Sequence, residues 1–509
     1  MEKLTLKQFE AYLFSNKRYQ LKKEQKDRVE ESFNFLKEFS KDKVIYGINT
    51  GFGPMAQYKI GDKQIGELQY NLIRSHASGI GKSLGEPYVK ALMIGRLNTL
   101  SLGFSGASPE LLSTLESFIE NDIYPYIPEH GGVGASGDLV QLAHLGLALI
   151  GEGKVVYKGK EQTCSEALKK AGIKAASLKL RDGLAVMNGT SCMSGIAVVN
   201  LIFAERLIHW SIQASSVMNE LTASYDDSFS VELNASKLHE GQQKVAQLMR
   251  HCVKDGKVLK KRNDHLFNGD HIKDKEYFSE KVQEYYSLRC VPQIIGPIWD
   301  AWQQANKVVE EELNSANDNP IICVDTKNVY HGGNFHGDYI AFEMDKLKIG
   351  ITKLSMLMER QLNYLMNAKL NDKFPPFLNK LKLGFNFGLQ GVQFTAVSTT
   401  AENQTLSNPM YIHSIPNNGD NQDIVSMGTN AASMTSKVID NSFEVLSIQL
   451  MAIAQAMDLS DNFDKFSSAA KDLHAMVRKD IAIIEEDRSL SEDISRLKMS
   501  ILNTQKELK

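Results

Sequence analysis

The segment of this chain that most directly suggests chemistry is glycine-rich and reads His130-Gly-Gly-Val-Gly-Ala-Ser-Gly-Asp138. An apolar run begins directly after it at Leu139, which predicts a helix whose first turn Asp138 is placed to cap. So many small residues in front of a helix fit two interpretations, a reaction of the backbone itself and the binding of a dinucleotide.

The backbone reaction would involve Ala135, Ser136 and Gly137. If the amide nitrogen of Gly137 attacks the carbonyl carbon of Ala135, these residues close into a five-membered ring. Glycine permits such a close approach because it has no Cβ. Loss of water, partly from Ser136, leaves an exocyclic methylidene, an electrophile that no standard side chain offers. The positive end of the following helix would stabilise negative charge on the ring oxygen.

The dinucleotide interpretation rests on Gly132, Gly134 and Gly137, which match the pattern G-x-G-x-x-G. That pattern has its meaning only after a strand and within a βαβ unit. The preceding segment, Ile123-Tyr-Pro-Tyr-Ile-Pro-Glu129, contains two prolines, which break a central strand. No convincing ribose-binding acid follows, so the sequence favours the backbone reaction.

Composition describes an ordinary globular chain of 509 residues, with 42% hydrophobic residues, 23% charged residues and a net charge of −3. So small a net charge argues against a surface that binds polyanions.

The five cysteines are scattered and lack metal-type spacing, which indicates a reducing compartment without structural disulfides. His331 and His336 have no supporting thiolates or acids, so we expect no metal site. Without a signal-peptide core or membrane span, the sequence predicts a cytoplasmic protein.

Helical patterns dominate the chain from Met193 onward. An apolar stripe recurs at intervals of three and four residues in Ile351, Leu354, Met358, Leu362 and Leu365. Two stretches, 193–224 and 426–457, are long and poor in charge, which is typical of helices buried in a bundle or between subunits. Short strands are predicted at 155–157 and 321–324.

Several further motifs carry a resemblance to a known family. They occur in that family's order and read Tyr46-Gly-Ile-Asn-Thr-Gly-Phe-Gly53, Asn71-Leu-Ile-Arg-Ser-His76, Asn188-Gly-Thr190, Tyr285-Tyr-Ser-Leu-Arg-Cys-Val-Pro-Gln293, Ser315-Ala-Asn-Asp-Asn-Pro320, Gly333-Asn-Phe-His336 and Asn421-Gln-Asp423. With the Ala-Ser-Gly segment, they resemble the histidine/phenylalanine/tyrosine ammonia-lyases, in which Ala-Ser-Gly forms a methylidene-imidazolone (MIO) group. The resemblance covers about residues 40 to 460 and is closest to the short bacterial tyrosine ammonia-lyases.

The resemblance implies a mainly α fold with a long central helical bundle. Residues 1–200 would form an N-terminal domain that bears the MIO group and a lid loop. Residues 201–460 would form the long-helix bundle, and residues 461–509 a helical C-terminal tail. The family is homotetrameric with active sites built from several chains, and the charge-poor helices fit such an assembly.

The reaction implied by the resemblance is the removal of ammonia from an aromatic L-amino acid. The MIO group, formed from Ala135, Ser136 and Gly137 without a dissociable cofactor, would take up the substrate amine and make it a better leaving group. Tyr46 matches the family's catalytic base, and Gly53, in the glycine-rich lid loop around it, matches a residue of the substrate-binding site. An ordinary tyrosine titrates near ~10, so the folded site must favour its charged form.

The same resemblance assigns roles to residues later in the chain. Arg289 would hold the substrate carboxylate with its two-pronged guanidinium. Tyr286, three residues earlier, would contact the MIO group and the amine. Asn188 matches a residue that supports the MIO oxygen. The remaining matches place Asn319 at the carboxylate, Phe335 beside the MIO group, and Asn421 and Gln422 in the substrate-binding site.

The ring that the pocket accepts depends on Ser75 and His76, which occupy the family's selectivity position. A histidine here could hydrogen-bond a phenol, and a pocket built around that bond would reject phenylalanine. Histidine ammonia-lyases also carry Ser-His here and an acid that matches Glu402. The chain departs from their late pattern at His413, Asn421-Gln422 and Ile424. We therefore favour L-tyrosine, and histidine ammonia-lyase and tyrosine 2,3-aminomutase remain open.

Overall fold

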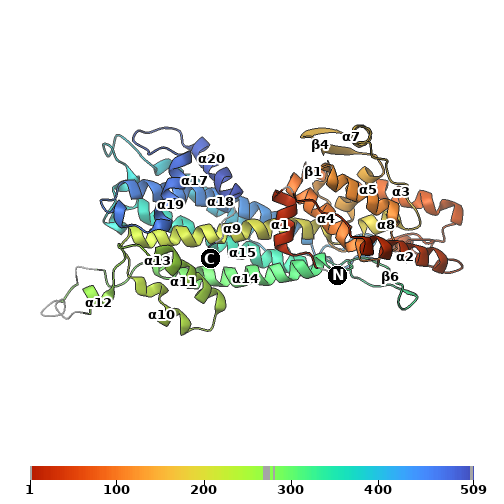
Figure 1. Cartoon of the computed structure of the whole chain (residues 1–509), viewed down its shortest axis with the longest axis horizontal. Coiled ribbons are helices and arrows are strands. Elements are labelled where there is room, and N and C mark those ends of the chain that lie inside the picture. Colours follow the sequence, from red (N-terminus) through yellow and green to blue (C-terminus); the bar gives the residue numbers. More distant parts are fainter. Residues whose placement is uncertain (1–2, 16, 268–275, 279–280, 505–507, 509) are drawn as a thin grey trace. The chain divides into compact units, whose positions relative to one another are not determined.

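The computed structural model describes residues 3–15, 17–267, 276–278, 281–504 and 508. The fold is mainly helical, as the sequence predicts, with short strands beside the helices (Figure 1). The chain divides into two compact units. Unit 1 comprises residues 1–202, 304–345 and 409–436, and unit 2 comprises residues 203–303, 346–408 and 437–509. Because each unit draws on three stretches, the boundaries predicted near residues 200 and 460 stay a prediction.

Unit 1 holds half of the shorter α-helices and all the strands of the described chain. A local signal sets the start of α5, where the Ser108 hydroxyl accepts a hydrogen bond from Leu111 N at 3.3 Å and Pro109 takes the first helical position. The helices are α1 (Leu6–Phe14), α2 (Lys23–Phe39), α3 (Ile65–His76), α4 (Glu86–Ser101), α5 (Pro109–Glu120), α6 (Leu139–Leu149), α7 (Cys164–Ala171) and α8 (Asp182–Met187).

The strands of unit 1 form three small antiparallel sheets. Their orders are β1-β3, β2-β4-β5 and β6-β7, with bounds β1 (Ile80–Ser83), β2 (Ile123–Pro125), β3 (Pro128–His130), β4 (Lys154–Tyr157), β5 (Lys160–Thr163), β6 (Ile321–Cys323) and β7 (Asn328–Tyr330). The predicted strands at 155–157 and 321–324 are confirmed as β4 and β6. The proline-containing segment 123–129 supplies two short edge strands to different sheets. No sheet of the described chain is parallel, so the βαβ unit required for dinucleotide binding is absent there.

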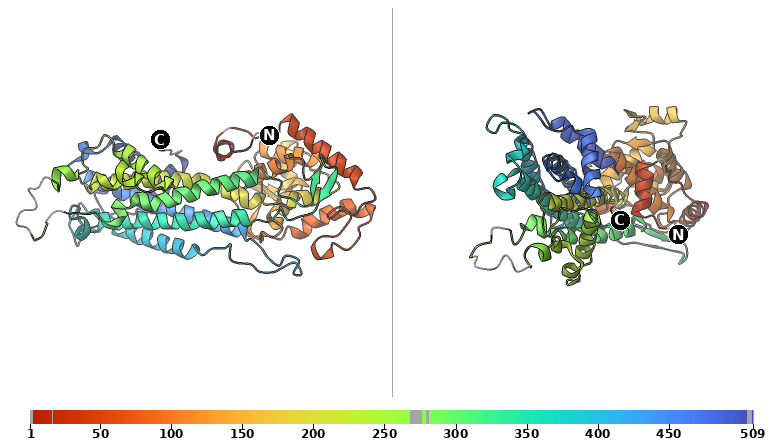
Figure 2. Two further views of the ribbon diagram at one scale, coloured as in Figure 1. Left: turned by 90° about the horizontal axis from the view of Figure 1, so that it is seen from below. Right: turned by 60° about the vertical axis from the view of Figure 1, so that its left-hand side comes forward.

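Four long helices contribute residues to both units: α9 (Ser191–Leu221), α14 (Val291–Leu313), α15 (Asp338–Met366) and α18 (Gly428–Asp458). They confirm the long helices predicted near 193–224 and 426–457 and the apolar stripe at 351–365. In unit 2 these helices lie side by side (Figure 2). The buried Gln361 of α15 joins them there, because its Nε2 donates to the Ser215 hydroxyl of α9 at 3.0 Å and its Oε1 accepts from Gln449 Nε2 of α18 at 2.6 Å.

The remaining helices of unit 2 are shorter. They are α10 (Val231–Ala235), α11 (Glu240–Val253), α12 (Arg262–His265), α13 (Tyr286–Arg289), α16 (Ala368–Asn371), α17 (Gln390–Leu406), α19 (Ser468–Asp480) and α20 (Ser491–Asn503). Helix α9 is the one described helix that is long and apolar enough to cross a membrane, but 89% of its most apolar stretch is buried within the protein. This burial fits a core helix.

Candidate active site

The Ala-Ser-Gly segment lies in the loop that joins β3 to α6, with Ala135 buried and Ser136 half-buried. Gly134 and Gly137 have φ values of +72° and +71°, which side chains with a Cβ rarely adopt. A Cβ on Gly137 would lie 2.0 Å from the carbonyl oxygen of Gly189. The loop is therefore pressed against the Asn188-Gly189 turn, and only glycine fits at position 137.

Two amide side chains contact Ser136. Asn188 Nδ2 donates to the Ser136 carbonyl oxygen at 3.2 Å, and Gln422 Nε2 donates to the Ser136 hydroxyl at 2.8 Å. In the predicted ring the Ser136 carbonyl becomes the ring oxygen, whereas the hydroxyl is the group that leaves. The two amides thus contact the two oxygens of Ser136 that the ring chemistry uses. Asn188 lies where the resemblance places a support for the ring oxygen.

Asp138 has a different role from the one that its position suggests. Its side chain makes no capping bond to α6 and instead accepts hydrogen bonds at the start of α9, from Cys192 N at 2.8 Å and Met193 N at 2.9 Å. Its other oxygen accepts a bond from the Thr429 hydroxyl at the start of α18. Burial raises the pKa of Asp138 to about 6, and these hydrogen bonds oppose that rise. The N-terminal ends of α6, α9 and α18 therefore converge on one carboxyl group beside Gly137.

Tyr46 is half-buried in the glycine-rich loop that follows α2. Gly53 N donates to the Tyr46 hydroxyl oxygen at 3.1 Å, and the Phe52 ring packs edge-on at a centroid distance of 6.0 Å. The bond from Gly53 N fixes where the Tyr46 hydroxyl oxygen lies. The buried Gln69 of α3 binds this loop, because its Nε2 donates to Gly47 O at 3.2 Å.

Ser75 and His76 end helix α3. His76 Nδ1 lies 2.9 Å from the carbonyl oxygen of Leu72, one helical turn earlier. This contact is a hydrogen bond only if Nδ1 carries the hydrogen, so in the neutral ring Nε2 keeps its lone pair. The Ser75 hydroxyl lies 3.0 Å from the same Nδ1 and donates to Leu72 O at 3.1 Å. With the hydrogen on Nδ1, His76 would offer Nε2 as a hydrogen-bond acceptor.

Three other predicted residues of unit 1 lie in loops. Asn319 accepts a hydrogen bond from Gly332 N at 2.8 Å through its Oδ1. Phe335 is half-buried in a loop that reaches the glycine-rich segment, because Gly337 N donates to Gly134 O at 3.3 Å. Asn421 is exposed beside Gln422.

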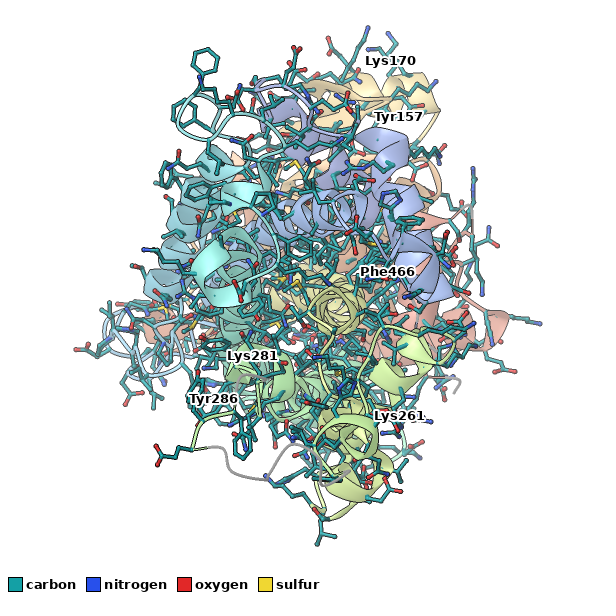
Figure 3. The ribbon with its side chains drawn as sticks, turned by 90° about the vertical axis from the view of Figure 1, so that its left-hand side faces the viewer. Tyr157, Lys170, Lys261, Lys281, Tyr286 and Phe466 are labelled. Atoms are coloured by element: carbon teal, nitrogen blue, oxygen red, sulfur yellow. The ribbon has the colours of Figure 1, made fainter. Side chains whose placement is uncertain are left out.

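Tyr286 and Arg289 lie in unit 2 on one turn of helix, α13, as their spacing predicts. The Arg289 guanidinium lies 4.7 Å from the centre of the Tyr286 ring, and its Nη1 donates to Gln283 Oε1. Both residues line an open cavity of about 710 Å³ with Lys281, which Figure 3 labels beside Tyr286, and with Arg360. Three cations and an exposed tyrosine ring lie at this cavity together with one carboxylate, Glu284, and the excess of cations suits a ligand that has both a carboxylate and an aromatic group.

Glu402 does not line that cavity. It is an exposed residue of α17 in unit 2, where its carboxylate accepts a hydrogen bond from Asn441 Nδ2 at 2.6 Å and lies 3.9 Å from Lys437 Nζ. Direct hydrogen bonds thus join Ser136 to Asn188 and Gln422 and Tyr46 to Gly53 in unit 1. Tyr286, Arg289 and Glu402 belong to unit 2.

Comparison with known proteins identifies the family. Residues 4–479 match the profile of the aromatic amino acid lyases. The chain belongs to this family. It is therefore an enzyme of the ammonia-lyase class, and the resemblance inferred from its motifs is confirmed.

Named relatives within the family differ in reaction and substrate. The chain is 38% identical to a tyrosine 2,3-aminomutase of Chondromyces crocatus, over 88% of this chain and 85% of that one. It is 37% identical to a histidine ammonia-lyase of Treponema denticola, over 97% and 94% of the two chains. It is 36% identical to a tyrosine ammonia-lyase of Cupriavidus metallidurans, over 89% and 86%. A solved phenylalanine aminomutase of Pantoea agglomerans superposes with a TM-score of 0.95, at 31% identity and 99% and 98% coverage.

The structure also reveals polar residues of this aromatic amino acid lyase that the sequence did not single out. Gln69 and Gln283 contact the Tyr46 loop and Arg289, and a fully buried arginine, Arg96, lies behind the Asn188-Gly189 turn. For Gln283 a signal existed, since it stands three residues before Tyr286 and six before Arg289. For Gln69 and Arg96 none existed, because each reaches residues more than 20 positions away.

Proposed function

We propose that this chain is a tyrosine ammonia-lyase, which converts L-tyrosine into trans-4-coumarate and ammonium. The observation that carries the proposal is the pair of amides on Ser136, with Asn188 at its carbonyl oxygen and Gln422 at its hydroxyl. Ring closure involves both oxygens of Ser136, because the carbonyl oxygen stays on the ring and the hydroxyl leaves. A side-chain amide donates to each of these oxygens.

Ring closure would proceed from the chain's own atoms. The amide nitrogen of Gly137 bonds to the carbonyl carbon of Ala135. The oxygen of Ala135 leaves as water with the amide hydrogens of Gly137 and Ser136, and a double bond forms between Ala135 C and Ser136 N. The Ser136 hydroxyl leaves as a second water with the hydrogen from its Cα, and the Cα–Cβ double bond forms. Asn188 donates to the oxygen that stays, and Gln422 donates to the one that leaves. Asn188 Oδ1 is buried without a partner in the described part of the chain, as expected beside a site that an amine would enter.

Once formed, the MIO group would supply an electrophile for the substrate amine. The Tyr46 oxygen, which accepts from Gly53 N, would take a proton from the substrate Cβ. The electron pair of that C–H bond would then form the double bond as the C–N bond breaks, and the amine would leave as ammonium with the proton that Tyr46 took. Arg289 would hold the carboxylate with its two-pronged guanidinium, and Asn319, whose Oδ1 accepts from Gly332 N, would donate to it through Nδ2.

L-Tyrosine is the proposed substrate because of His76. Its Nδ1 contacts the Leu72 carbonyl, so Nε2 would accept a hydrogen bond from a phenol hydroxyl. Phenylalanine would leave that acceptor without a partner. The second candidate is a tyrosine 2,3-aminomutase, which would return the amine to Cβ, and the relative at 38% identity favours it. Histidine is a further substrate candidate, since an imidazole N–H could also donate to Nε2.

A homotetramer with shared active sites completes the proposal. Helix α17 lies largely exposed although Glu402 is its one charged residue, and two apolar side chains, Phe394 and Val397, are 65% and 45% exposed. An apolar helix face of this kind is typical of a surface that another subunit covers.

One experiment tests the reaction and its substrate together. The purified enzyme is incubated separately with L-tyrosine, L-histidine and L-phenylalanine, and the products are identified by chromatography against coumarate, β-tyrosine, urocanate and cinnamate. Coumarate as the main product would support the proposal. β-Tyrosine would establish the aminomutase, and urocanate the histidine enzyme. Ser136→Ala serves as the inactive comparison, and Ser113→Ala, on the exposed side of α5, as the matched active control.

The mass of the chain tests the electrophile independently. Loss of two waters makes the peptide that spans residues 135–137 lighter by about 36 Da than the encoded sequence, as two waters of ~18 Da each require. An unmodified peptide in fully active enzyme would overturn the proposed chemistry.

A further inference from the structure

A buried arginine lies behind the Asn188-Gly189 turn. Arg96 belongs to α4 and is fully buried. Its Nη2 donates to the carbonyl oxygens of Asn188, at 2.9 Å, and Ala185, while its Nη1 donates to Asn317 Oδ1 at 3.1 Å. A Cβ on Gly189 would lie 2.1 Å from Nη1. Arg96 thus binds Asn188 by its carbonyl oxygen and lies directly against Gly189, the residue that presses on Gly137.

A second buried arginine holds the segment that contains Asn319. Arg181 donates to both carboxylate oxygens of Asp318, at 2.9 Å and 3.1 Å, and to the carbonyl oxygen of Asn319 at 2.9 Å. Asp318 is buried as well, and one of its oxygens lies 3.9 Å from Nη2 of Arg96. One carboxylate therefore stands between two guanidinium groups.

We propose that Arg96, Asp318 and Arg181 form a buried brace that sets the spacing between Asn188 and Asn319. The inference rests on the proposed function, in which Asn188 supports the ring oxygen and Asn319 the substrate carboxylate. Each arginine donates a hydrogen bond to the backbone carbonyl oxygen of one asparagine. The Asp318 carboxylate forms an ion pair with both arginines. The three are positioning residues, since they act through the asparagines rather than on the substrate.

Charge and geometry explain why arginine occupies both places. Burial lowers the pKa of Arg96 to about 10, and the charge of Asp318 opposes that change, so the group stays charged at neutral pH. A guanidinium offers five donors in a fixed plane and can bridge several oxygens at once, which an ammonium cannot do. Two cations around one buried anion are costly unless their hydrogen bonds are met. Here the carbonyl oxygens of Asn188 and Asn319 accept from the two arginines, although the Nε of each arginine is buried without a partner among the described residues. The active-site loops are therefore part of the cluster.

The two ends of the brace can be tested separately. At the ring end, Arg96→Lys, and the milder Asn317→Ala, which removes the acceptor of Arg96 Nη1, should lower the fraction of chains that are about 36 Da lighter than encoded. At the carboxylate end, Arg181→Lys should leave that fraction unchanged and raise KM on the order of tenfold, the low end of the effect of residues that orient a catalytic group. Both readouts are taken on the soluble, folded fraction.

The matched control is Glu116→Gln, a buried carboxylate of unit 1 that binds Leu21 N and Lys26. This substitution should lower stability without contact to Asn188 or Asn319. The fraction of chains with the mass loss, and the KM, should therefore equal those of the wild type. Asp318→Asn, which makes the same chemical change within the brace, should alter both.

A double-substitution cycle separates positioning from general loosening of the fold. In an Asn319→Ala background, Arg181→Lys should raise KM less than about twofold, because the group through which it acts is gone. An equal increase in KM in both backgrounds would overturn the brace, as would normal ring formation in Arg96→Lys and Asn317→Ala. A wild-type chain without the mass loss would instead refute the proposed function, so the two failures are distinguishable.

Discussion

Tyr46 and His76 carry the parts of the proposed reaction that single substitutions can isolate. Each is oriented by a backbone group, Tyr46 by Gly53 N and His76 by the Leu72 carbonyl. These contacts fix where the Tyr46 oxygen lies and, with the hydrogen on Nδ1 of His76, leave Nε2 as the atom that faces a ligand as acceptor. A change of the side chain removes that atom and leaves the backbone that positions it in place.

Tyr46→Phe should abolish most of the turnover while the fold and the mass loss at residues 135–137 persist. The substitution removes only the proton acceptor, because the ring can still pack against Phe52. The measurements are kcat for L-tyrosine, circular dichroism and peptide mass. Near-normal kcat in a folded, fully matured variant would show that another residue takes the proton.

His76→Phe should shift the preference from tyrosine toward phenylalanine. The substitution removes the acceptor for the phenol hydroxyl and offers an apolar wall, and an unpaired buried polar group costs about 1–3 kcal/mol. The ratio of kcat/KM for the two substrates measures the shift. Ser75→Ala, which retains the His76–Leu72 contact, should change the ratio little. An unchanged ratio in His76→Phe would contradict a role for this histidine in substrate choice.

At the scale of elements, the sequence predicted those helices that depend on the spacing of apolar residues along the chain. The apolar stripe at 351–365 and the charge-poor runs near 193–224 and 426–457 gave the helices correctly, because periodicity depends on neighbours along one helix. The role of Asp138 was wrong, since its partners Cys192 and Thr429 are far away in sequence. The sequence also could not predict the cluster around Arg96 and Asp318, whose members come together only in the folded chain.

The close approach of α9 and α4 gives a prediction about packing. A Cβ on Gly195 would lie 2.6 Å from Leu92 N and 2.7 Å from Leu92 Cα, and backbone cannot rotate away as a side chain can. Gly195→Ala should therefore lower the free energy of unfolding by about 1–3 kcal/mol. Gly66→Ala in α3 is the matched control, because nothing lies within 4 Å of its Cβ; it should be neutral or stabilise by up to about 1 kcal/mol. Equal Tm values for the two variants would refute the close contact.

The start of α19 should make stability depend on pH. Glu220 of α9 accepts hydrogen bonds from Ser467 N at 2.8 Å and from its hydroxyl at 2.7 Å, and burial raises the pKa of Glu220 from 4.5 to about 7. A raised pKa means that the folded state binds the proton more tightly. The stability from this group is therefore complete below pH 4.5 and is lost as pH rises to about 7.

Glu220→Gln lacks this titration, so the Tm of the variant relative to the wild type should rise between pH 4.5 and 7. A shift of this size corresponds to at most about 4 kcal/mol at ~1.4 kcal/mol per pKa unit. Thermal unfolding of both proteins across this range measures the difference. Two parallel curves of Tm against pH would show that the carboxyl group does not titrate there.

At the scale of the whole molecule, the residues proposed for one reaction are divided between the two units. Tyr46, Ser136 and Asn188 lie in unit 1, and Tyr286 and Arg289 in unit 2. Both units also leave apolar side chains exposed, including Tyr339 and Ile424 in unit 1 and Phe394 and Val397 in unit 2. Large exposed apolar side chains are typical of surfaces that associate. Assembly and activity are thus expected to depend on each other in the proposed homotetramer.

Phe394→Glu should separate that assembly. The side chain is 65% exposed on the charge-poor face of α17, so a glutamate there leaves the single chain nearly unaffected but places an unpaired charge within a subunit contact. Light scattering coupled to size exclusion should report a smaller particle than the wild type, and turnover of L-tyrosine should fall with it. Leu238→Glu, at a position that is 92% exposed between α10 and α11, is the control and should keep the wild-type mass and activity. If Phe394→Glu keeps the wild-type particle size, α17 is not a subunit contact, and its charge-poor face needs another explanation.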